Sequence, residues 1–379
     1  MLTETTSRLQ QQGEDFQQTL PHTIRPYASR AWGHGLHSLC SYQGKLKPSL
    51  AHWMVRQFTA PGDRVVDPLG GVGTIAFEAG LLGRVPFTTD LSPFASTVAR
   101  AKVAPPTPEL LWAAFEQFTS ALELEKLSDD DTASAAFGLN ATVSDYYHPE
   151  TLQEVLKAKR YFSARDLSAG SNFIKACLLH ILHGNRPYAL SRTSHPITPF
   201  SPTGEFEYRS VVERLQKRLL RLIELDRPNE FNPGQSWHSD FRGLPELLDA
   251  PVDAVLCSPP FPGMRFDRPN WLRMWFCGWG ANDFHQTSKS FLERQQGKTF
   301  SVYKEFFATC AEITKSGSPV ILHVGGSKGY DMATHLIELS RPYFRHQGTV
   351  IEAVDHVEKH GISDKGTTSS HILLLFERF

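Results

Sequence analysis

Four consecutive residues, Ser258, Pro259, Pro260 and Phe261, offer chemistry that an ordinary turn does not need. They follow the apolar run 252–257, which reads as a buried strand, where turn chemistry would favour Asn, Asp or Gly. Proline fixes φ and has no N–H, so two in succession stiffen the backbone and point carbonyl groups outward. The Ser258 hydroxyl and the Pro259 carbonyl therefore present two hydrogen-bond acceptors at a strand end.

A second group lies in the glycine-rich stretch DPLGGVGTIA, residues 67–76. Gly71, Gly73 and Ala76 have the G-x-G-x-x-[GA] spacing of a dinucleotide-binding fold. Asp90 lies 17 residues after Gly73, where a ribose-binding acid is expected. Spacing alone fits a nicotinamide enzyme, and it also fits a plain strand-to-helix turn.

The charge of Asp67, just before the glycines, favours another ligand. Its carboxylate would face a pyrophosphate at close range, and like charges repel. S-adenosylmethionine has no phosphate and carries an ammonium and a sulfonium, which an acid attracts. Glycines still serve this ligand because the backbone must turn sharply and approach it closely. We therefore predict a methyl-donor site, with a dinucleotide site and a ligand-free turn as alternatives.

A methyl donor needs an acceptor, and the Ser-Pro-Pro-Phe motif fits the amino group of a nucleobase. The lone pair of such a nitrogen is delocalised into the ring, and acceptors around the NH₂ favour a pyramidal nitrogen. Ser258 and Pro259 can supply those acceptors, and Phe261 offers a face for stacking. Base stacking contributes roughly 1–3 kcal/mol, comparable with the few kcal/mol needed to flip a base out of a duplex.

Together, the segments DPLGGVGT, TDLSP and CSPPF resemble the S-adenosylmethionine-dependent amino-methyltransferases of DNA. The form with Ser258 resembles the branch that methylates cytosine N4, whereas adenine N6 enzymes more often have Asp or Asn there. The resemblance covers about 31–105 and 236–379, and implies a class I, Rossmann-like α/β fold with a mostly parallel sheet and a C-terminal β-hairpin. Leu69 departs from the pattern, because the family's glycine loop usually has an aromatic residue there.

The resemblance also implies how the donor is bound. Tyr42 and Lys45, together with Pro48 in the segment before the loop, would contribute to the methionine end. Asp90 would hold the ribose, and Asp240 the adenine amino group, with Phe241 beside the ring. The full implied donor site is Tyr42, Lys45, Asp67, Pro68, Leu69, Gly71, Gly73, Thr74, Asp90, Leu91, Asp240 and Phe241.

Hydrophobic periodicity predicts one α/β sheet interrupted by helices. Strand-and-helix alternation begins near residue 48, lapses after 106 and resumes near 252. The lapse contains helical patterns at 107–127, 148–165, 171–183 and 208–225. We predict a loosely attached polar arm at 1–30, a methyltransferase domain at 31–106 and 234–379, and a helical insertion at 107–233 that is the candidate DNA target-recognition region.

Basic residues gather on the 208–221 helix with its preceding loop, and in the loop after the Pro-Pro motif. Such runs are commonly solvated helix faces, and the tryptophans of the second loop fit a core better than base stacking. If the substrate is DNA, these side chains can reach phosphates and base edges. The predicted DNA contacts are Arg186, Arg192, His195, Arg209, Arg265 and Arg268.

Composition narrows the class of protein. A net charge of −1 gives no global attraction to nucleic acid. The apolar runs are too short to cross a membrane, so we expect a cytoplasmic protein with no membrane partner. Five scattered cysteines form no CxxC pair, and the helical pair His180 and His183 reads as structural, so no metal is predicted.

Other functions stay open at this point. Cytosine C5 methylation needs a thiolate nucleophile, normally in a Pro-Cys dipeptide that this chain lacks, and Cys257 reads as a small buried residue. Adenine N6 methylation, an RNA base as substrate, and a catalytically silent donor-binding or nucleic-acid-binding module are the alternatives. Double-stranded DNA is the expected partner; a cognate restriction enzyme and a homodimer remain open.

Overall fold

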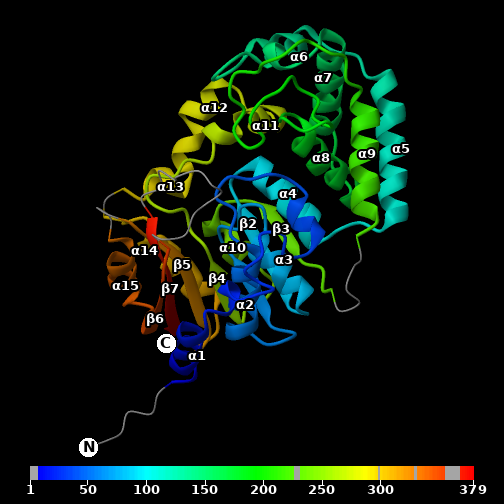
Figure 1. Ribbon diagram of the computed structural model, residues 1–379. Coiled ribbons are helices and arrows are strands. Elements are labelled where there is room, and N and C mark those ends of the chain that lie inside the picture. The colour runs from blue at the N-terminus through cyan, green and yellow to red at the C-terminus, as the bar shows by residue number, and fades with distance from the viewer. Residues whose placement is uncertain (1–6, 226–230, 298, 328–330, 355–367) are drawn as a thin grey trace, which may run out of the picture.

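A single seven-stranded sheet organises the part of the chain that the computed structural model describes, residues 7–225, 231–297, 299–327, 331–354 and 368–379 (Figure 1). Its strand order is β3-β2-β1-β4-β5-β7-β6, and only β7 runs antiparallel to its neighbours. This confirms the predicted class I, mostly parallel sheet with a C-terminal antiparallel pair. The strands are β1 Arg64–Asp67, β2 Val85–Asp90, β3 Gln235–His238, β4 Ala254–Cys257, β5 Pro319–Ser327, β6 Phe344–Ala353 and β7 Thr368–Arg378.

Strand order explains why the two motifs meet. β1 and β4 are parallel neighbours, with Val65 paired to Ala254 and Val66 to Val255. Parallel neighbours have their carboxyl ends at the same edge of a sheet. The glycine loop after β1 and the Ser-Pro-Pro-Phe segment after β4 therefore open side by side.

Helices cover both faces of the sheet, which is why its central strands are apolar on both sides. α2 Pro48–Phe58 and α3 Thr74–Leu81 pack on the face that contains Val65, Ala254 and Leu256. On the other face, Val66 and Val255 pack in the cluster that includes α14 Tyr303–Ile313 and α15 Met332–Ser340. The two adjacent valines of β1 thus contribute to different layers.

The inserted helices lie beyond the carboxyl edge of the sheet (Figure 1). They are α5 Pro108–Leu124, α6 Asp129–Ala133, α7 Pro149–Ser163, α8 Ala169–Ile181 and α9 Val211–Ile223, and α5, α7, α8 and α9 match the four predicted helical stretches. Their core is continuous with Val72 and with Phe94 of α4 Pro93–Val103. The insertion therefore has no separate hydrophobic core.

The segment after the Pro-Pro motif, which the sequence predicts to be a loop, folds into short helices. These are α11 Trp271–Phe276, α12 Ala281–His285 and α13 Leu292–Gln295. Trp271 and Trp275 are fully buried in the same core as the insertion, which confirms that they are core residues.

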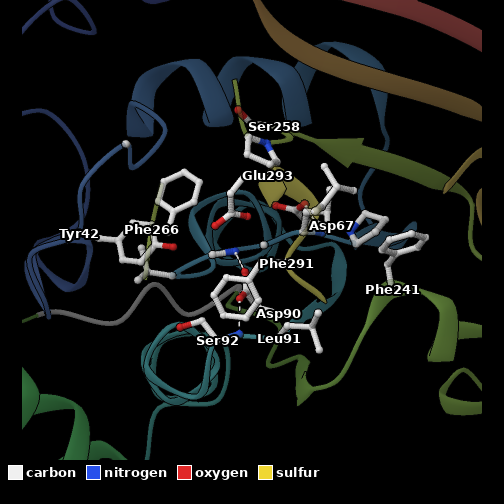
Figure 2. Close-up of a pocket in the computed structure, with 18 of the residues that line it drawn as sticks. Tyr42, Asp67, Asp90, Leu91, Ser92, Phe241, Ser258, Phe266, Phe291 and Glu293 are labelled. Atoms are coloured by element: carbon white, nitrogen blue, oxygen red, sulfur yellow. Dashed lines mark hydrogen bonds between the residues drawn. The ribbon is translucent and has the colours of Figure 1, made fainter. Parts of the chain in front are cut away.

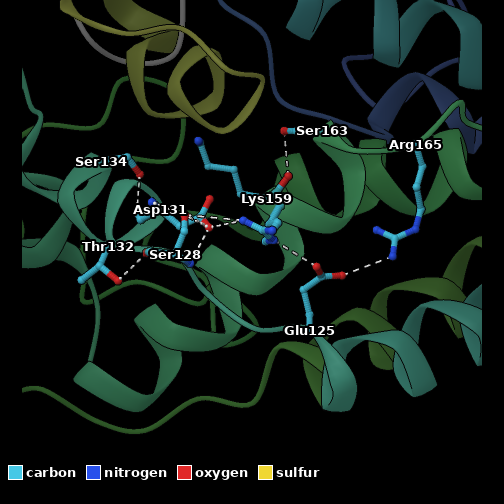
Figure 3. Close-up of polar contacts among 9 residues, drawn as sticks. Glu125, Ser128, Asp131, Thr132, Ser134, Lys159, Ser163 and Arg165 are labelled. Atoms are coloured by element: carbon cyan, nitrogen blue, oxygen red, sulfur yellow. Dashed lines mark hydrogen bonds and ion pairs between the residues drawn. The ribbon is translucent and has the colours of Figure 1, made fainter.

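Arg160 of α7 forms ion pairs with two acids of the insertion, Glu125 and Asp131, which are labelled in Figure 3. Its Nε lies 3.2 Å from Glu125 Oε1 after α5, and its Nη1 lies 2.7 Å from Asp131 Oδ2 in α6. Arg165 adds a second ion pair to Glu125, at 3.3 Å. These polar contacts orient the short α6 against the longer helices.

The predicted N-terminal arm begins at residues 1–6, which lie outside the described residues, but its part at 8–19 is packed on the sheet. Residues Arg8–Thr19 form α1, which buries Leu9 and Phe16 against the sheet, next to its edge strand β6. The Gln17 amide exchanges two hydrogen bonds with the Ile351 backbone of β6, at 2.6 and 3.0 Å. The apolar spacing of Leu9 and Phe16 is helical, and the abundant polar residues around them concealed it.

Replacing Phe16 tests how strongly α1 supports the sheet. Phe16→Ala should lower the free energy of unfolding by about 3–5 kcal/mol, because a fully buried ring leaves a cavity. Urea denaturation is the measurement, and Gln18→Ala, on the exposed face of the same helix, is the control. Equal stability of the two variants would show that α1 does not contribute to the folded core.

Candidate active site

One cavity lies at the carboxyl ends of β1, β2 and β4 (Figure 2). It contains about 900 Å³ of empty space, including the part that is open to solvent. Gly71 and Pro260, far apart in the sequence, both line it, as the sequence predicted. The glycine loop and the Pro-Pro segment therefore share one site.

The glycines of the loop are required by its backbone. Gly71 and Gly73 have φ values of 52° and 68°, in the left-handed region that side chains disfavour. A Cβ on Gly73 would lie 2.9 Å from Ala99 Cβ in α4, so only glycine allows this close approach. Gly71 N–H points away from the turn and donates to Asp90 Oδ2 at 2.9 Å.

Asp67, the last residue of β1, is buried beside Cys257 at the end of β4. Burial raises the pKa of Asp67 to about 7, opposed by hydrogen bonds from the Cys257 thiol and the Leu69 N–H. Burial together with the nearby Asp67 raises the pKa of the Cys257 thiol well above its usual range. Cys257 is therefore a buried thiol that donates to Asp67, which agrees with its predicted structural role.

Asp90, the last residue of β2, anchors the glycine loop and borders the cavity. Its two carboxylate oxygens accept the N–H groups of Gly71 at 2.9 Å and Ser92 at 2.7 Å. Burial raises the pKa of Asp90 to about 6, and those two N–H donors limit the rise. Each oxygen keeps a lone pair for a further donor.

Two predicted residues of the segment before α2 line the same cavity. The Tyr42 ring stacks on Phe266 with 5.7 Å between centroids and 13° between planes. Lys45 Nζ donates to His37 O at 2.8 Å, and burial lowers the pKa of Lys45. Pro68, Leu69, Thr74 and Leu91 also border the cavity.

Asp240 and Phe241 line the cavity from the segment that follows β3. The Asp240 carboxylate accepts Arg242 N–H at 2.9 Å and forms an ion pair with the Arg242 guanidinium at 3.0 Å. Phe241 is buried against Phe306 of α14, with 5.5 Å between ring centroids. All twelve residues of the implied donor site except Gly73 thus border this one cavity.

Glu293 of α13 and Phe291, which precedes this helix, also line the cavity, and no sequence pattern predicts them (Figure 2). Burial raises the pKa of Glu293 to about 7, with Asp90 adding a like charge. Its Oε1 is buried and has no hydrogen-bond partner among the described residues. No local pattern marks this acid, because its place depends on how 262–297 folds back over the sheet.

The acceptor motif lies at the same rim. Ser258 Oγ lies 2.9 Å from His323 Nδ1 of β5, a partner that the sequence did not predict. Ser258 and Pro260 line the cavity, and Pro259 is buried. The Phe261 ring packs on Gly325 and near His323, with 5.4 Å between the two ring centroids, and is not a lining residue.

Three of the six predicted DNA contacts are arginines of the insertion, and all three already bind within the chain. Arg186 Nη1 donates to His180 Nε2 at 2.8 Å and to Tyr188 Oη at 3.0 Å. Arg192 donates to two backbone carbonyls, of Gly204 at 2.8 Å and Asp145 at 3.1 Å.

Arg209 is the third, and pairs with Glu207 at 3.0 Å while it donates to Ala189 O at 3.1 Å. Arg209 thus binds within the segment 184–209, whereas Arg186 and Arg192 connect that segment to His180 and Asp145. A guanidinium has five donors, so DNA contact by these residues stays a prediction.

The other three predicted contacts differ in exposure. Arg265 pairs with the buried Asp267 at 2.8 Å, whereas Arg268 and His195 are exposed. Nearby Arg273 is fully buried and donates to three backbone carbonyls and Asn270, so it braces the core.

A metal site and a membrane span were searched for among the described residues only. No group of three or more His, Cys, Asp or Glu there is arranged to bind a metal, and His180 and His183 are buried with ring hydrogen bonds. Within the same residues, no helix combines the length and apolar character of a membrane span.

The charge of the cavity lining distinguishes between the candidate cofactors. Four acids, Asp67, Asp90, Asp240 and Glu293, border the cavity against one lysine, Lys45. A pyrophosphate would face this excess of carboxylates, whereas an ammonium and a sulfonium are attracted by it. The unpartnered Glu293 Oε1 also fits a ligand that brings a hydrogen-bond donor or a positive charge.

One family model, that of a methyltransferase domain, matches part of the chain. Residues 38–128 match the UPF0020 family model, described as RMKL-like, methyltransferase domain. No curated protein matches the chain.

Solved structures similar to the chain include three methyltransferases. TrmN from Thermus thermophilus has 14% identity and a TM-score of 0.36, over 89% of this chain and 50% of that one, so the chain spans half its length. The rRNA methyltransferase aviRa from Streptomyces viridochromogenes has 12% identity and a TM-score of 0.33, and the match covers 93% of this chain and 96% of aviRa.

The third is a putative class I S-adenosylmethionine-dependent methyltransferase from Listeria monocytogenes, with 11% identity and a TM-score of 0.34. The match covers 97% of this chain and 68% of that protein. Three observations point to a methyltransferase domain: the strand order, the acid-lined cavity beside the glycine loop, and the family match over residues 38–128. The chain carries a class I methyltransferase domain that uses S-adenosylmethionine as methyl donor.

Proposed function

We propose that this protein methylates the exocyclic amino group of a nucleobase, with N4 of a flipped cytosine in DNA as the first candidate. The observation that supports this proposal is the meeting of two chemistries in one cavity. Ser258 and Pro260 line the cavity together with Asp67, Asp90 and Gly71. An amino-group acceptor motif and a donor-binding loop are both required, and both are present.

The donor-binding roles follow from what each side chain can still offer. The free lone pairs of Asp90 accept the two ribose hydroxyls, and Asp240 accepts the adenine amino group beside Phe241. Lys45 pairs with the carboxylate of the methionine end. Asp67 and Glu293 supply negative charge toward the ammonium and sulfonium.

In the transfer step the chain acts mainly by orientation. The bound donor supplies an activated methyl group, and no metal is required. Ser258 Oγ and the Pro259 carbonyl accept the two N–H groups of the amine and aim its lone pair at the methyl carbon. The donor would supply the methyl group and keep the C–S electron pair as a neutral thioether, and the amine would lose one proton to solvent.

The insertion is the proposed substrate-recognition region, because its helices lie beyond the carboxyl edge of the sheet (Figure 1), the edge at which the cavity is found. Arg268 and His195 are exposed and can reach the polymer directly. Arg186, Arg192, Arg209 and Arg265 would use guanidinium N–H groups that remain outside their internal hydrogen bonds. Phe261 would stack on the base only after its ring leaves the surface of Gly325.

An RNA base is the second candidate substrate, because the motif chemistry is the same and the solved structures above include an rRNA methyltransferase. Adenine N6 is the third. A single assay separates them. Methyl-labelled donor is incubated with duplex DNA or with RNA, and the products are digested to nucleosides. N4-methylcytosine in DNA supports the first candidate; label only in RNA supports the second; no label with intact donor binding means a silent module.

Donor affinity should rise with pH. Asp67 and Glu293, with pKa values of about 7, and Asp90, with about 6, are partly protonated in the donor-free protein near pH 6. A cationic ligand stabilises the carboxylates, so affinity increases between about pH 5.5 and 8, by up to about tenfold per pH unit for each coupled group. Calorimetry gives the Kd values, and buffers of different ionisation enthalpy give the protons released.

Glu293→Gln is the matched variant for this titration. Its donor affinity should depend less steeply on pH than that of the unmodified protein. The variant Asp130→Ala, which changes an exposed acid, should show the same pH dependence as the unmodified protein. A flat profile would contradict the electrostatic roles of these acids. Without donor, the free energy of unfolding should fall as pH rises toward 7, because the three pKa values lie above those of the unfolded chain.

A further inference from the structure

His323 is the partner of the proposed catalytic hydroxyl, and no sequence motif marks it. It lies on β5, the parallel neighbour of β4, and pairs across the sheet with Leu373 of β7. Its side chain is buried, and Nδ1 lies 2.9 Å from Ser258 Oγ. This is the one hydrogen bond that the described residues provide to that hydroxyl.

A serine hydroxyl alone is an ambiguous acceptor. It has two lone pairs and one proton, and it rotates freely, so it can equally offer its proton to an incoming amine. The Asp or Asn found at this position in related adenine enzymes has an oxygen that only accepts. Serine becomes equivalent to that oxygen only when its own proton is engaged elsewhere.

We propose that His323 is the positioning residue for Ser258: Nδ1 accepts the serine proton and thereby turns both Oγ lone pairs toward the amino group of the base. This deepens the proposed function and rests on it. The hydrogen bond fixes the hydroxyl rotamer before the substrate arrives, which removes the cost of ordering it during reaction.

The surroundings keep His323 neutral, as this role requires. Burial holds the pKa of His323 well below its usual range, and His371 and His22 lower it further. Glu352 lies between those two histidines, 2.8 Å from His22 and 3.9 Å from His371. Nε2 then carries the ring proton; it is buried, with the rings of Phe261 and His371 packed near the imidazole.

The kinetic test compares His323→Leu in three backgrounds. With Ser258 present, it should lower kcat about tenfold, the value of one hydrogen bond, while the donor Kd stays unchanged. With Ser258→Ala or Ser258→Asn, the same change should alter kcat by less than about twofold, because no serine proton remains to be held. Equal losses in all backgrounds would overturn the proposal and indicate a purely structural histidine.

Two further variants control for packing. His323→Asn places an amide oxygen near the Nδ1 position and should restore much of the rate lost in His323→Leu. His346→Leu, at an exposed strand position, should behave as the unmodified protein. Failure of the Asn variant to exceed the Leu variant would argue against an acceptor role.

A second measurement does not depend on activity. Nitrogen-15 spectra of the histidines should show His323 as the neutral tautomer protonated on Nε2, and Ser258→Ala should shift its Nδ1 resonance. A proton on Nδ1 would overturn the proposal even if methyl transfer occurs. If neither DNA nor RNA is methylated but the spectra match, the proposed substrate fails while the hydroxyl–imidazole pair stands.

Discussion

Ser258→Ala should reduce the rate of methyl transfer by roughly 10²–10³-fold, the usual loss when one oriented polar partner of a reacting group is removed. The amine then lacks one of its two acceptors, and its lone pair is less available. Donor binding should change little, because the hydrogen bond that the described residues provide to Ser258 Oγ comes from His323 and not from a proposed donor-binding residue. Single-turnover kinetics with labelled donor measure the rate, and calorimetry measures the donor Kd.

The donor Kd is also the internal control for that variant. A large loss of donor affinity would place Ser258 in the donor site and contradict its assignment to the amine. Ser258→Asn provides a matched comparison, because its amide oxygen still accepts. We expect it to retain more activity than Ser258→Ala.

Asp90→Ala should weaken donor binding by about 100-fold or more, since hydrogen bonds to a charged group contribute roughly 1.5–3 kcal/mol each. Two effects combine in this variant. The proposed ribose contact is lost, and the N–H groups of Gly71 and Ser92 lose their acceptor, which frees the loop from β2. Calorimetric titration with donor measures the change.

Asp90→Asn separates the two effects. Its single amide oxygen can accept only on one side, so donor affinity should fall between that of the Ala variant and the unmodified protein. Asp130→Ala, an exposed acid of α6, controls for the general loss of negative charge. Unchanged affinity in Asp90→Ala would contradict the assignment of the donor site.

The fold and the donor loop could be predicted because their signals are local. Apolar runs such as 64–67 and 252–257 read as buried strands, and left-handed φ values at Gly71 and Gly73 explain why glycine occurs there. β3 was not recognised as a strand, because QSWH is short and has no apolar alternation. Its place at the sheet edge leaves its side chains partly exposed, so burial does not shape its sequence.

The rest of the site depends on long-range packing. Glu293 and His323 belong to segments with no chemical motif, and only the fold brings them to the cavity and to Ser258. The basic residues show the opposite error of sequence reading. Arg192 and Arg209 were predicted to contact DNA, yet each donates to backbone carbonyls of the chain, because loops without regular structure need such donors.

The shared core beneath the inserted helices bears on engineering of this protein. A chimera that exchanged only residues 107–233 would cut between Phe94 and α8, and would strip Trp271 and Trp275 of their neighbours. A graft that also carried 262–291 would keep Trp271 and Trp275 with their neighbours in the insertion, although Phe94 would still be replaced as a partner. The recognition region and the catalytic domain would therefore have to be exchanged together. Substituting single exposed side chains is a better route to altered specificity than exchanging the insertion.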